Sequence, residues 1–283
     1  MIVTANNPNP ELWPTLGVWQ NREQILVSAT FPGVPAFTCD AWCYESAVDF
    51  IDAQPLDGGR LQLHHRVREH PNLVLLTIVT PEPDAVEFVA RIEPETPASK
   101  MPEDLLVPNL CWQLKRAPTF ASVPEPYPEF VKRCFIFTDA GLTFLHQTER
   151  LKIPHLPAED PKNNPVWVQM YLPVWEPLRR APSTAWADYS RDRYIYPVIG
   201  AISRDGQYLA AIANDMPKAL CQAWHDCMHN NPAWLPDEER REPIWRLKIY
   251  AMENNPDKLL ECMGRDFPHA LTLKERRVPA EVA

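Results

Sequence analysis

The chain contains 283 residues, of which 32 are proline and only 8 are glycine, and its formal net charge is −9. Proline at this density interrupts long helices, because it has no amide N–H and clashes with the preceding turn. No glycines are spaced as in a Rossmann fingerprint or a P-loop, and an acidic chain repels phosphate backbones. The composition therefore argues against a helical bundle or a doubly wound nucleotide-binding fold, and we expect no nucleic-acid partner.

Runs of alternating or continuous apolar residues predict strands along most of the chain. Turn signals at 57–59, 139–141 and 204–206 join three pairs of them into hairpins. The predicted strands cover residues 47–51, 60–68, 73–80, 85–92, 131–138, 142–148, 198–203, 208–213 and 245–250. Short helices are predicted at 218–229, after Pro217, and at 256–263, ended by Gly264. We therefore expect a mainly β protein, a large antiparallel β-sandwich that forms a single domain over residues 1–283.

Residues 154–197 form a different kind of segment, which is rich in proline and in aromatic residues. Tryptophans and tyrosines recur along it, at Trp167, Tyr171, Trp175, Trp186, Tyr189, Tyr194 and Tyr196. Disordered segments avoid aromatic residues, and long irregular loops in compact domains are usually functional. We expect an ordered loop insertion that covers one face of the sandwich.

The cysteine content and the length of the apolar runs indicate where in the cell the protein is expected. The seven cysteines are an odd number in a chain that shows no signal peptide, so reduced and mostly buried thiols are expected. The longest apolar run, around Leu73 to Val79, is too short to span a bilayer. The sequence predicts a cytoplasmic protein with no membrane partner.

The densest cluster of reactive residue types lies between Cys221 and Trp234. On the predicted helix, Cys221, His225 and His229 lie on one face at i, i+4 and i+8, a spacing that could bind zinc. Two other interpretations stay open: a helix end that packs into the core, or a polar site. In the polar site, His225 or His229 is an acid–base group oriented by Asp226.

Polar residues share one face of several predicted strands. His64 and Arg66 alternate with the apolar residues of 60–68, and Glu87 and Arg91 do so in 85–92. Such a face either binds a sugar or is simply solvated, and arginines on it would suit an acidic sugar.

Three stretches resemble the galactose-mutarotase-like β-super-sandwich of carbohydrate-active proteins. They are residues 60–66, residues 135–150, and residues 228–234 followed by 245–250. The resemblance implies that a sugar binds on the concave face of a large sheet. In the mutarotases of that family, a histidine acid and a glutamate base act on the sugar.

We accordingly predict a carbohydrate-active protein that binds a sugar or an oligosaccharide, including an acidic one, by epimerase, lyase or hydrolase chemistry. A non-catalytic carbohydrate-binding module and an oligomeric scaffold protein remain the alternatives, and no cofactor or metal is expected. The predicted catalytic residues are His229, His225, His146, Asp226, Glu87 and Glu45. The predicted substrate-binding residues are Trp42, Tyr44, His64, Arg66, Arg91, Trp112, Arg150, Trp175, Asn230, Trp234 and Lys248.

Overall fold

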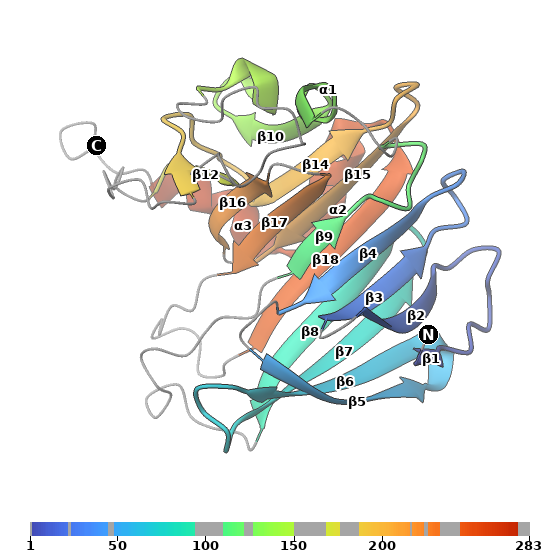
Figure 1. The fold of residues 1–283 in the computed structure, drawn as a ribbon. Helices are drawn as coiled ribbons and strands as arrows, with labels where there is room; N and C mark the ends of the chain where they lie inside the picture. The colour runs from blue at the N-terminus through green and yellow to red at the C-terminus, as the bar shows by residue number, and fades with distance from the viewer. Residues whose placement is uncertain are drawn as a thin grey trace.

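A computed structural model of the chain consists of two large β-sheets that pack face to face, with helices on the far side of one of them (Figure 1). The structure describes residues 2–21, 24–44, 48–93, 110–121, 127–149, 168–175, 187–215, 217–223, 226–232 and 244–276. Over these residues each sheet has nine strands. The predicted class, a mainly β protein with a large antiparallel sandwich and few short helices, is confirmed.

The first sheet combines strands from both ends of the chain. In spatial order it contains β1 (Val3–Thr4), β2 (Thr15–Asn21), β3 (Gln24–Thr30), β4 (Thr38–Cys43), β9 (Leu110–Gln113), β17 (Cys227–Pro232), β16 (Pro217–Ala223), β12 (Val168–Tyr171) and β13 (Ala187–Tyr189). All neighbours are antiparallel except β12 and β13, which are parallel. The β9–β17 pairing therefore joins the N-terminal strands of this sheet to the C-terminal ones.

The second sheet is built mainly from hairpins. Its strands in spatial order are β11 (Gly141–Phe144), β10 (Cys134–Thr138), β14 (Val198–Ile202), β15 (Tyr208–Asn214), β18 (Ile244–Glu253), β8 (Ala85–Glu93), β7 (Val74–Glu82), β6 (Arg60–Val67) and β5 (Val48–Leu56). Gly141 and Gly206 occupy left-handed backbone conformations at two of the predicted turns, with φ of 92° and 76°. These strands are the ones that the sequence predicted.

The main core lies between the two sheets and alternates with outward residues along each strand. In β6, for example, Leu61, Leu63, His65 and Val67 are buried, whereas Arg66 is exposed. Trp112 and Tyr44 are among the largest fully buried side chains of this core. The seven cysteines are all reduced and buried, as the sequence predicted.

Two helices form a third layer behind the second sheet. Helix α2 (Pro256–Asp266) is capped by Asn255 and begins with Pro256. With α3 (Pro268–Thr272), it packs on the outward residues of β10, β14, β15 and β18. The predicted helix at 256–263 is confirmed, but Gly264 does not end it: a Cβ there would lie 2.8 Å from Leu271, so glycine lets α3 approach α2. A third short helix among the described residues is α1 (Tyr127–Val131).

Two sequence predictions about local structure were wrong. The described residues of the segment 218–229 form no helix, because all of them except Asp226 belong to β16 or β17. Both faces of these strands are covered, so their residues show no clear strand alternation. The segment 154–197 is not wholly irregular either: it contains β12 and the edge strand β13 of the first sheet, and residues 154–167 and 176–186 lie outside the described part. No helix of the described residues is long and apolar enough to cross a membrane.

Candidate functional site

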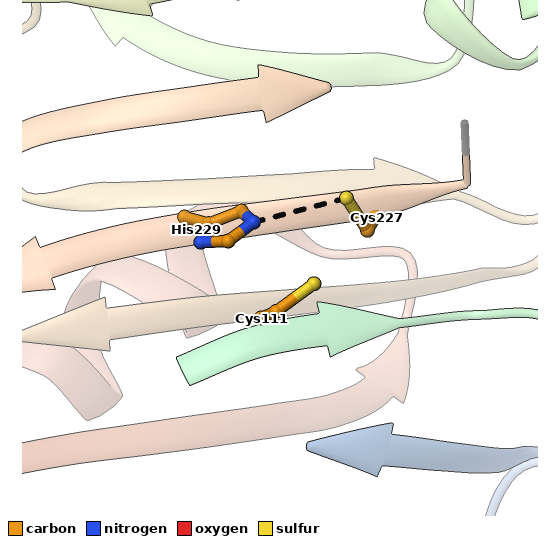
Figure 2. Close-up of side chains that lie close together, drawn as sticks. All are labelled: Cys111, Cys227 and His229. Atoms are coloured by element: carbon orange, nitrogen blue, oxygen red, sulfur yellow. Dashed lines mark hydrogen bonds between the residues drawn. The ribbon is translucent and has the colours of Figure 1, made fainter. Parts of the chain in front are cut away.

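Two cysteines and a histidine lie together on the outward face of the first sheet, the face turned away from the second sheet (Figure 2). Cys111 comes from β9, and Cys227 and His229 come from β17. Residues two apart on a strand share a face, so Cys227 and His229 point to the same side. Antiparallel pairing then sets Cys111 directly across from His229. We call these three residues the cysteine–histidine cluster.

The potential ligand atoms of the cluster are close enough to share one ion. The two Sγ atoms and a ring nitrogen of His229 all lie within 4.8 Å of one another. His229 Nε2 is 3.8 Å from Cys227 Sγ, the contact drawn in Figure 2. Gln113, the cross-strand partner of Cys227, donates its Nε2 hydrogen to Cys111 Sγ at 3.5 Å.

The cluster is almost completely buried, although it is not in the core between the sheets. Cys111 and Cys227 are 2% and 0% exposed, and His229 is 9% exposed. Half-buried Trp42 and Val168 pack against the two cysteines. A hydrogen bond with Cys227 and interactions with His229 hold the pKa of the Cys111 thiol well below its usual value, although burial opposes them.

Two other buried cysteines of this sheet behave differently. Cys39 and Cys43 point from β4 into the core, where burial raises the pKa of each thiol to about 12. Burial in the core therefore keeps these two thiols protonated. The cysteine–histidine cluster is a local exception that favours a thiolate, which is the form that binds metals.

The backbone register favours a shared ion over a disulfide. Cys111 and Cys227 are diagonal neighbours, because Cys227 pairs with Gln113. Diagonal Cα atoms on paired strands are about 7–8 Å apart, whereas disulfides usually need about 6.8 Å or less. Two thiols and an imidazole can meet around a cation without moving either strand.

The interpretation in which Cys221, His225 and His229 bind zinc from one helix face loses its basis, because β16 and β17 replace the helix. Cys221 lies on β16 as the cross-strand partner of His229, on the side opposite to Cys111. Its Sγ accepts a hydrogen bond from Asn231 Nδ2 at 3.3 Å. Asp226, predicted to orient a histidine, lies just before β17, and its backbone oxygen accepts from Leu114 N at 2.9 Å. Four predicted site residues lie outside the described part: Glu45, Arg150, His225 and Trp234.

Three predicted substrate-binding residues belong instead to the core between the sheets. Trp112 and Tyr44 are 0% and 1% exposed, so neither ring can stack on a ligand at the surface. Asn230 is also fully buried, and its Nδ2 donates to the backbone oxygens of Pro197 and Ile212. Strand parity explains the error for Trp112 and Asn230, because neighbours of the outward residues Cys111 and His229 necessarily face inward. Tyr44 follows the end of β4, where its left-handed backbone, with φ of 65°, breaks the alternation.

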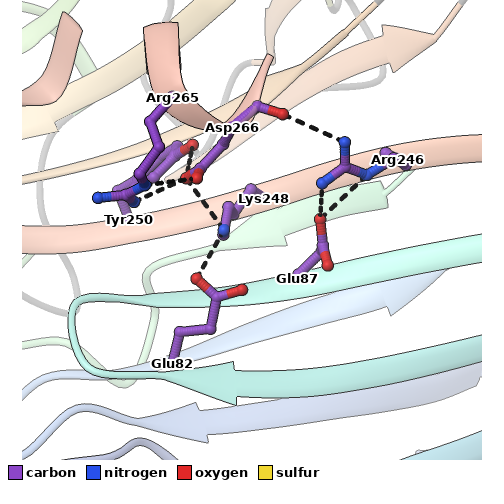
Figure 3. Close-up of polar contacts among 7 residues, drawn as sticks. All are labelled: Glu82, Glu87, Arg246, Lys248, Tyr250, Arg265 and Asp266. Atoms are coloured by element: carbon purple, nitrogen blue, oxygen red, sulfur yellow. Dashed lines mark hydrogen bonds and ion pairs between the residues drawn. The ribbon is translucent and has the colours of Figure 1, made fainter. Parts of the chain in front are cut away.

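Lys248 and Glu87 lie on the outward face of the second sheet, close to the end of α2. Lys248 is 2% exposed and ion-pairs with Glu82 and Asp266 at 2.6 and 2.9 Å (Figure 3). Glu87 pairs with Arg246. These contacts join α2 to the sheet, so the two side chains are part of an ion-pair network.

The remaining predicted residues are spread over four places. His64, Arg66 and Arg91 share the outward face of the second sheet with Glu87, at its β5–β8 end. A bulge in β5 brings Asp52 opposite His64, and Asp52 Oδ1 accepts from His64 Nδ1 at 2.7 Å. His146 is exposed in the 3-10 turn Leu145–Gln147 and stacks on Phe144. Trp42 borders the cysteine–histidine cluster, and Trp175 packs edge-on against Tyr194.

Sequence reasoning selected His229 but missed Cys111, Cys227 and Gln113. Cys111 and Gln113 stand far from His229 in the chain, and no metal motif has such a separation. Two local signals were present: the stretch 110–113, in which a cysteine and a glutamine alternate with apolar residues, and the spacing of Cys227 and His229, which stand two residues apart.

Comparisons with known proteins give no relative from which a function could be transferred. No model of a known protein family matches the chain, and no curated protein matches it in sequence.

Proposed function

We propose that the protein binds one divalent cation, with zinc as the best fit, through Cys111, Cys227 and His229. The observation that carries the proposal is the meeting of two thiols and an imidazole within 4.8 Å. Thiolate and imidazole ligands are typical of zinc in proteins, and such ligands bind about 2.0–2.3 Å from the ion. Ligands at that distance around a tetrahedral ion lie about 3.5–3.8 Å from one another, so the three groups need to approach one another by about 1 Å at most.

Charge balance favours a divalent ion over a monovalent one. Two thiolates and a neutral imidazole carry two negative charges, which a divalent cation cancels. A monovalent copper ion would leave a net negative charge among half-buried Trp42 and Val168, and burial penalises such a charge. The neighbouring Asp40 adds little, because Arg116 binds it at 2.5 and 2.8 Å.

Metal content and affinity of purified protein test this function. We expect wild-type protein dialysed against zinc to retain one ion per chain, and Cys111→Ser, Cys227→Ser and His229→Ala to lower the affinity at least about 100-fold. Cys43→Ala is the matched control, because Cys43 is a buried cysteine of adjacent β4 that points into the core. Absence of zinc from the wild type, or full zinc content in a Cys111→Ser/Cys227→Ser double variant, would contradict the proposal.

Carbohydrate binding is our second proposal, placed on the outward face of the second sheet. The supporting observation is that His64, Arg66, Glu87 and Arg91 share this face, with His64 held by Asp52. This arrangement resembles what the similarity to mutarotase-like sandwiches implied, a sugar on one face of a large sheet. Polar groups at one end of such a face can hydrogen-bond the hydroxyls or carboxylate of a sugar.

Thermal stabilisation by a panel of neutral and uronic-acid oligosaccharides tests the second proposal. We expect at least one glycan to raise the melting temperature of the wild type, and His64→Ala or Arg91→Ala to abolish that effect. His146→Ala is the control, because this exposed histidine follows β11 at the other edge of the sheet. A response that survives both variants, or the lack of any response, would remove the carbohydrate proposal.

A further inference from the structure

We infer that the metal centre keeps one coordination position open for a small anion or water, and that Gln113 is the residue that positions this ligand. The inference rests on the proposed metal-binding function. It goes further, because it specifies an exchangeable centre with a binding position for an external ligand.

The first step is the arrangement of four outward residues on two paired strands. Cys111 and Gln113 alternate along β9, and Cys227 and His229 alternate along β17. The register pairs Cys111 with His229 and Gln113 with Cys227, so the four side chains occupy the corners of a square. Three corners carry metal ligands, and the fourth carries an amide.

The second step is the chemistry of that fourth corner. Gln113 is 9% exposed, and its Nε2 donates to Cys111 Sγ at 3.5 Å. An amide nitrogen has two hydrogens, so the nitrogen that donates to the thiolate can donate its second hydrogen to a neighbouring ligand on the same ion. Two other candidate ligands on this face are already engaged: Cys221, across from His229, accepts from Asn231 Nδ2 at 3.3 Å, and Asp40, across from Gln113, is bound by Arg116 at 2.8 Å. Neither belongs to the group of ligand atoms that lie within 4.8 Å of one another.

The third step is the number of ligands that zinc prefers. Zinc takes four ligands, and sites with three protein ligands complete the set with water or substrate. The cation neutralises the two thiolates, so an incoming anion meets a neutral centre beside a hydrogen-bond donor. The ligand class that fits is a small anion or its protonated form, such as hydroxide, water, azide or a carboxylate, because half-buried Trp42 and Val168 border the two cysteines.

Cobalt(II) substitution with azide as the probe tests the inference on the full chain. Thiolate-to-cobalt charge-transfer absorption reports whether the ion binds at the cysteines, and the visible ligand-field bands report whether azide joins it. We expect azide to shift these bands saturably in the wild type, and Gln113→Leu to weaken the azide affinity about tenfold, because one charge-assisted hydrogen bond is lost. Gln62→Leu is the matched control, an outward glutamine on β6 of the other sheet.

Each other outcome contradicts one part of the inference or of the proposed function on which it rests. No thiolate-to-cobalt absorption means that the proposed metal-binding function fails. Cobalt binding without an azide response in the wild type means that the centre is closed. If azide then binds only to Gln113→Leu, the amide oxygen of Gln113 is itself the fourth ligand. Equal azide affinity in wild type and Gln113→Leu means that the position is open but Gln113 does not position the ligand.

Discussion

His65 is an imidazole inside an aromatic part of the core. It is 1% exposed and lies edge-on to Tyr44 and Phe50, with ring centroids 5.2 and 5.6 Å away. Neither ring nitrogen has a hydrogen-bond partner among the residues that the structure describes. Burial therefore lowers the pKa of His65 from 6.5 to about 4, since the charged form is poorly solvated there.

This depressed pKa makes the stability of the protein depend on pH. In the unfolded chain His65 takes up a proton below about pH 6.5, whereas the folded protein resists protonation until about pH 4. The free energy of unfolding should therefore fall as the pH drops through this window, by on the order of 3 kcal/mol from this group. We expect the free energy of unfolding, measured in urea at pH 7.0 and at pH 4.5, to fall less between these two pH values for His65→Leu than for the wild type.

The control for this prediction is His146→Gln. His146 is exposed, so its replacement should leave the pH dependence of stability as it is in the wild type. Equal stability losses for His65→Leu and wild type between the two pH values would refute the role of His65. The alternation of Leu61, Leu63, His65 and Val67 in the sequence is enough to place His65 on the buried face of the strand. It gave no indication that the ring would lack partners, because that depends on Tyr44 and Phe50 from other strands.

At the scale of elements, α2 is fastened to the second sheet by charged groups around Asp266 (Figure 3). Its carboxylate accepts from Lys248 Nζ, Tyr250 Oη and Arg265 Nε at 2.9, 2.9 and 2.8 Å. Burial raises the pKa of Asp266, but the hydrogen bonds from Arg265 and Lys248 outweigh it and keep the pKa below its usual value. One side chain at the end of α2 thus anchors the helix on β18.

We expect Asp266→Asn to destabilise the protein by about 2–4 kcal/mol, because it leaves the buried Lys248 ammonium with Glu82 as its remaining carboxylate. Thermal and urea unfolding measure the effect. Arg265→Gln is the matched control: it removes a partner of the same carboxylate, but its side chain is 65% exposed, so the loss should stay below about 1 kcal/mol. Equal losses of unfolding free energy for the two variants would show that the burial of Lys248 does not determine the effect of losing Asp266.

The two sheets differ in how far the sequence could predict them. All nine predicted strands belong to the second sheet, whose hairpins show regular alternation and glycine turns. The strands of the first sheet were not predicted. Their outward positions also carry apolar or soft side chains, including Trp19, Leu26 and Cys111, so no polar face marks the strand period.

The candidate site was less predictable than the fold for the same reason. Local sequence selected His229, but placed it on a helix with Cys221. The cross-strand pairing of β9 with β17 brings Cys111 and Gln113 to it, and this contact has no local sequence signal.

At the scale of the whole molecule, the two proposed sites lie on opposite outer surfaces of the sandwich. The cysteine–histidine cluster is on the outward face of the first sheet, and His64 and Arg91 are on that of the second. The shared core, with residues such as Leu63 and Trp112, separates them. Variants of one site should therefore affect the other only through overall stability, because distant sites without shared partners usually act independently.

The β9–β17 pairing also has a consequence for how the chain assembles. The hairpins of the second sheet can form from neighbouring segments, whereas the first sheet is continuous only when Cys111 meets His229 across a long stretch of chain. Closing so long a loop is entropically unfavourable and slows folding. A cation held by both strands would lower the free energy of the closed state alone, so that metal availability would influence how readily the two ends of the chain join into one sheet.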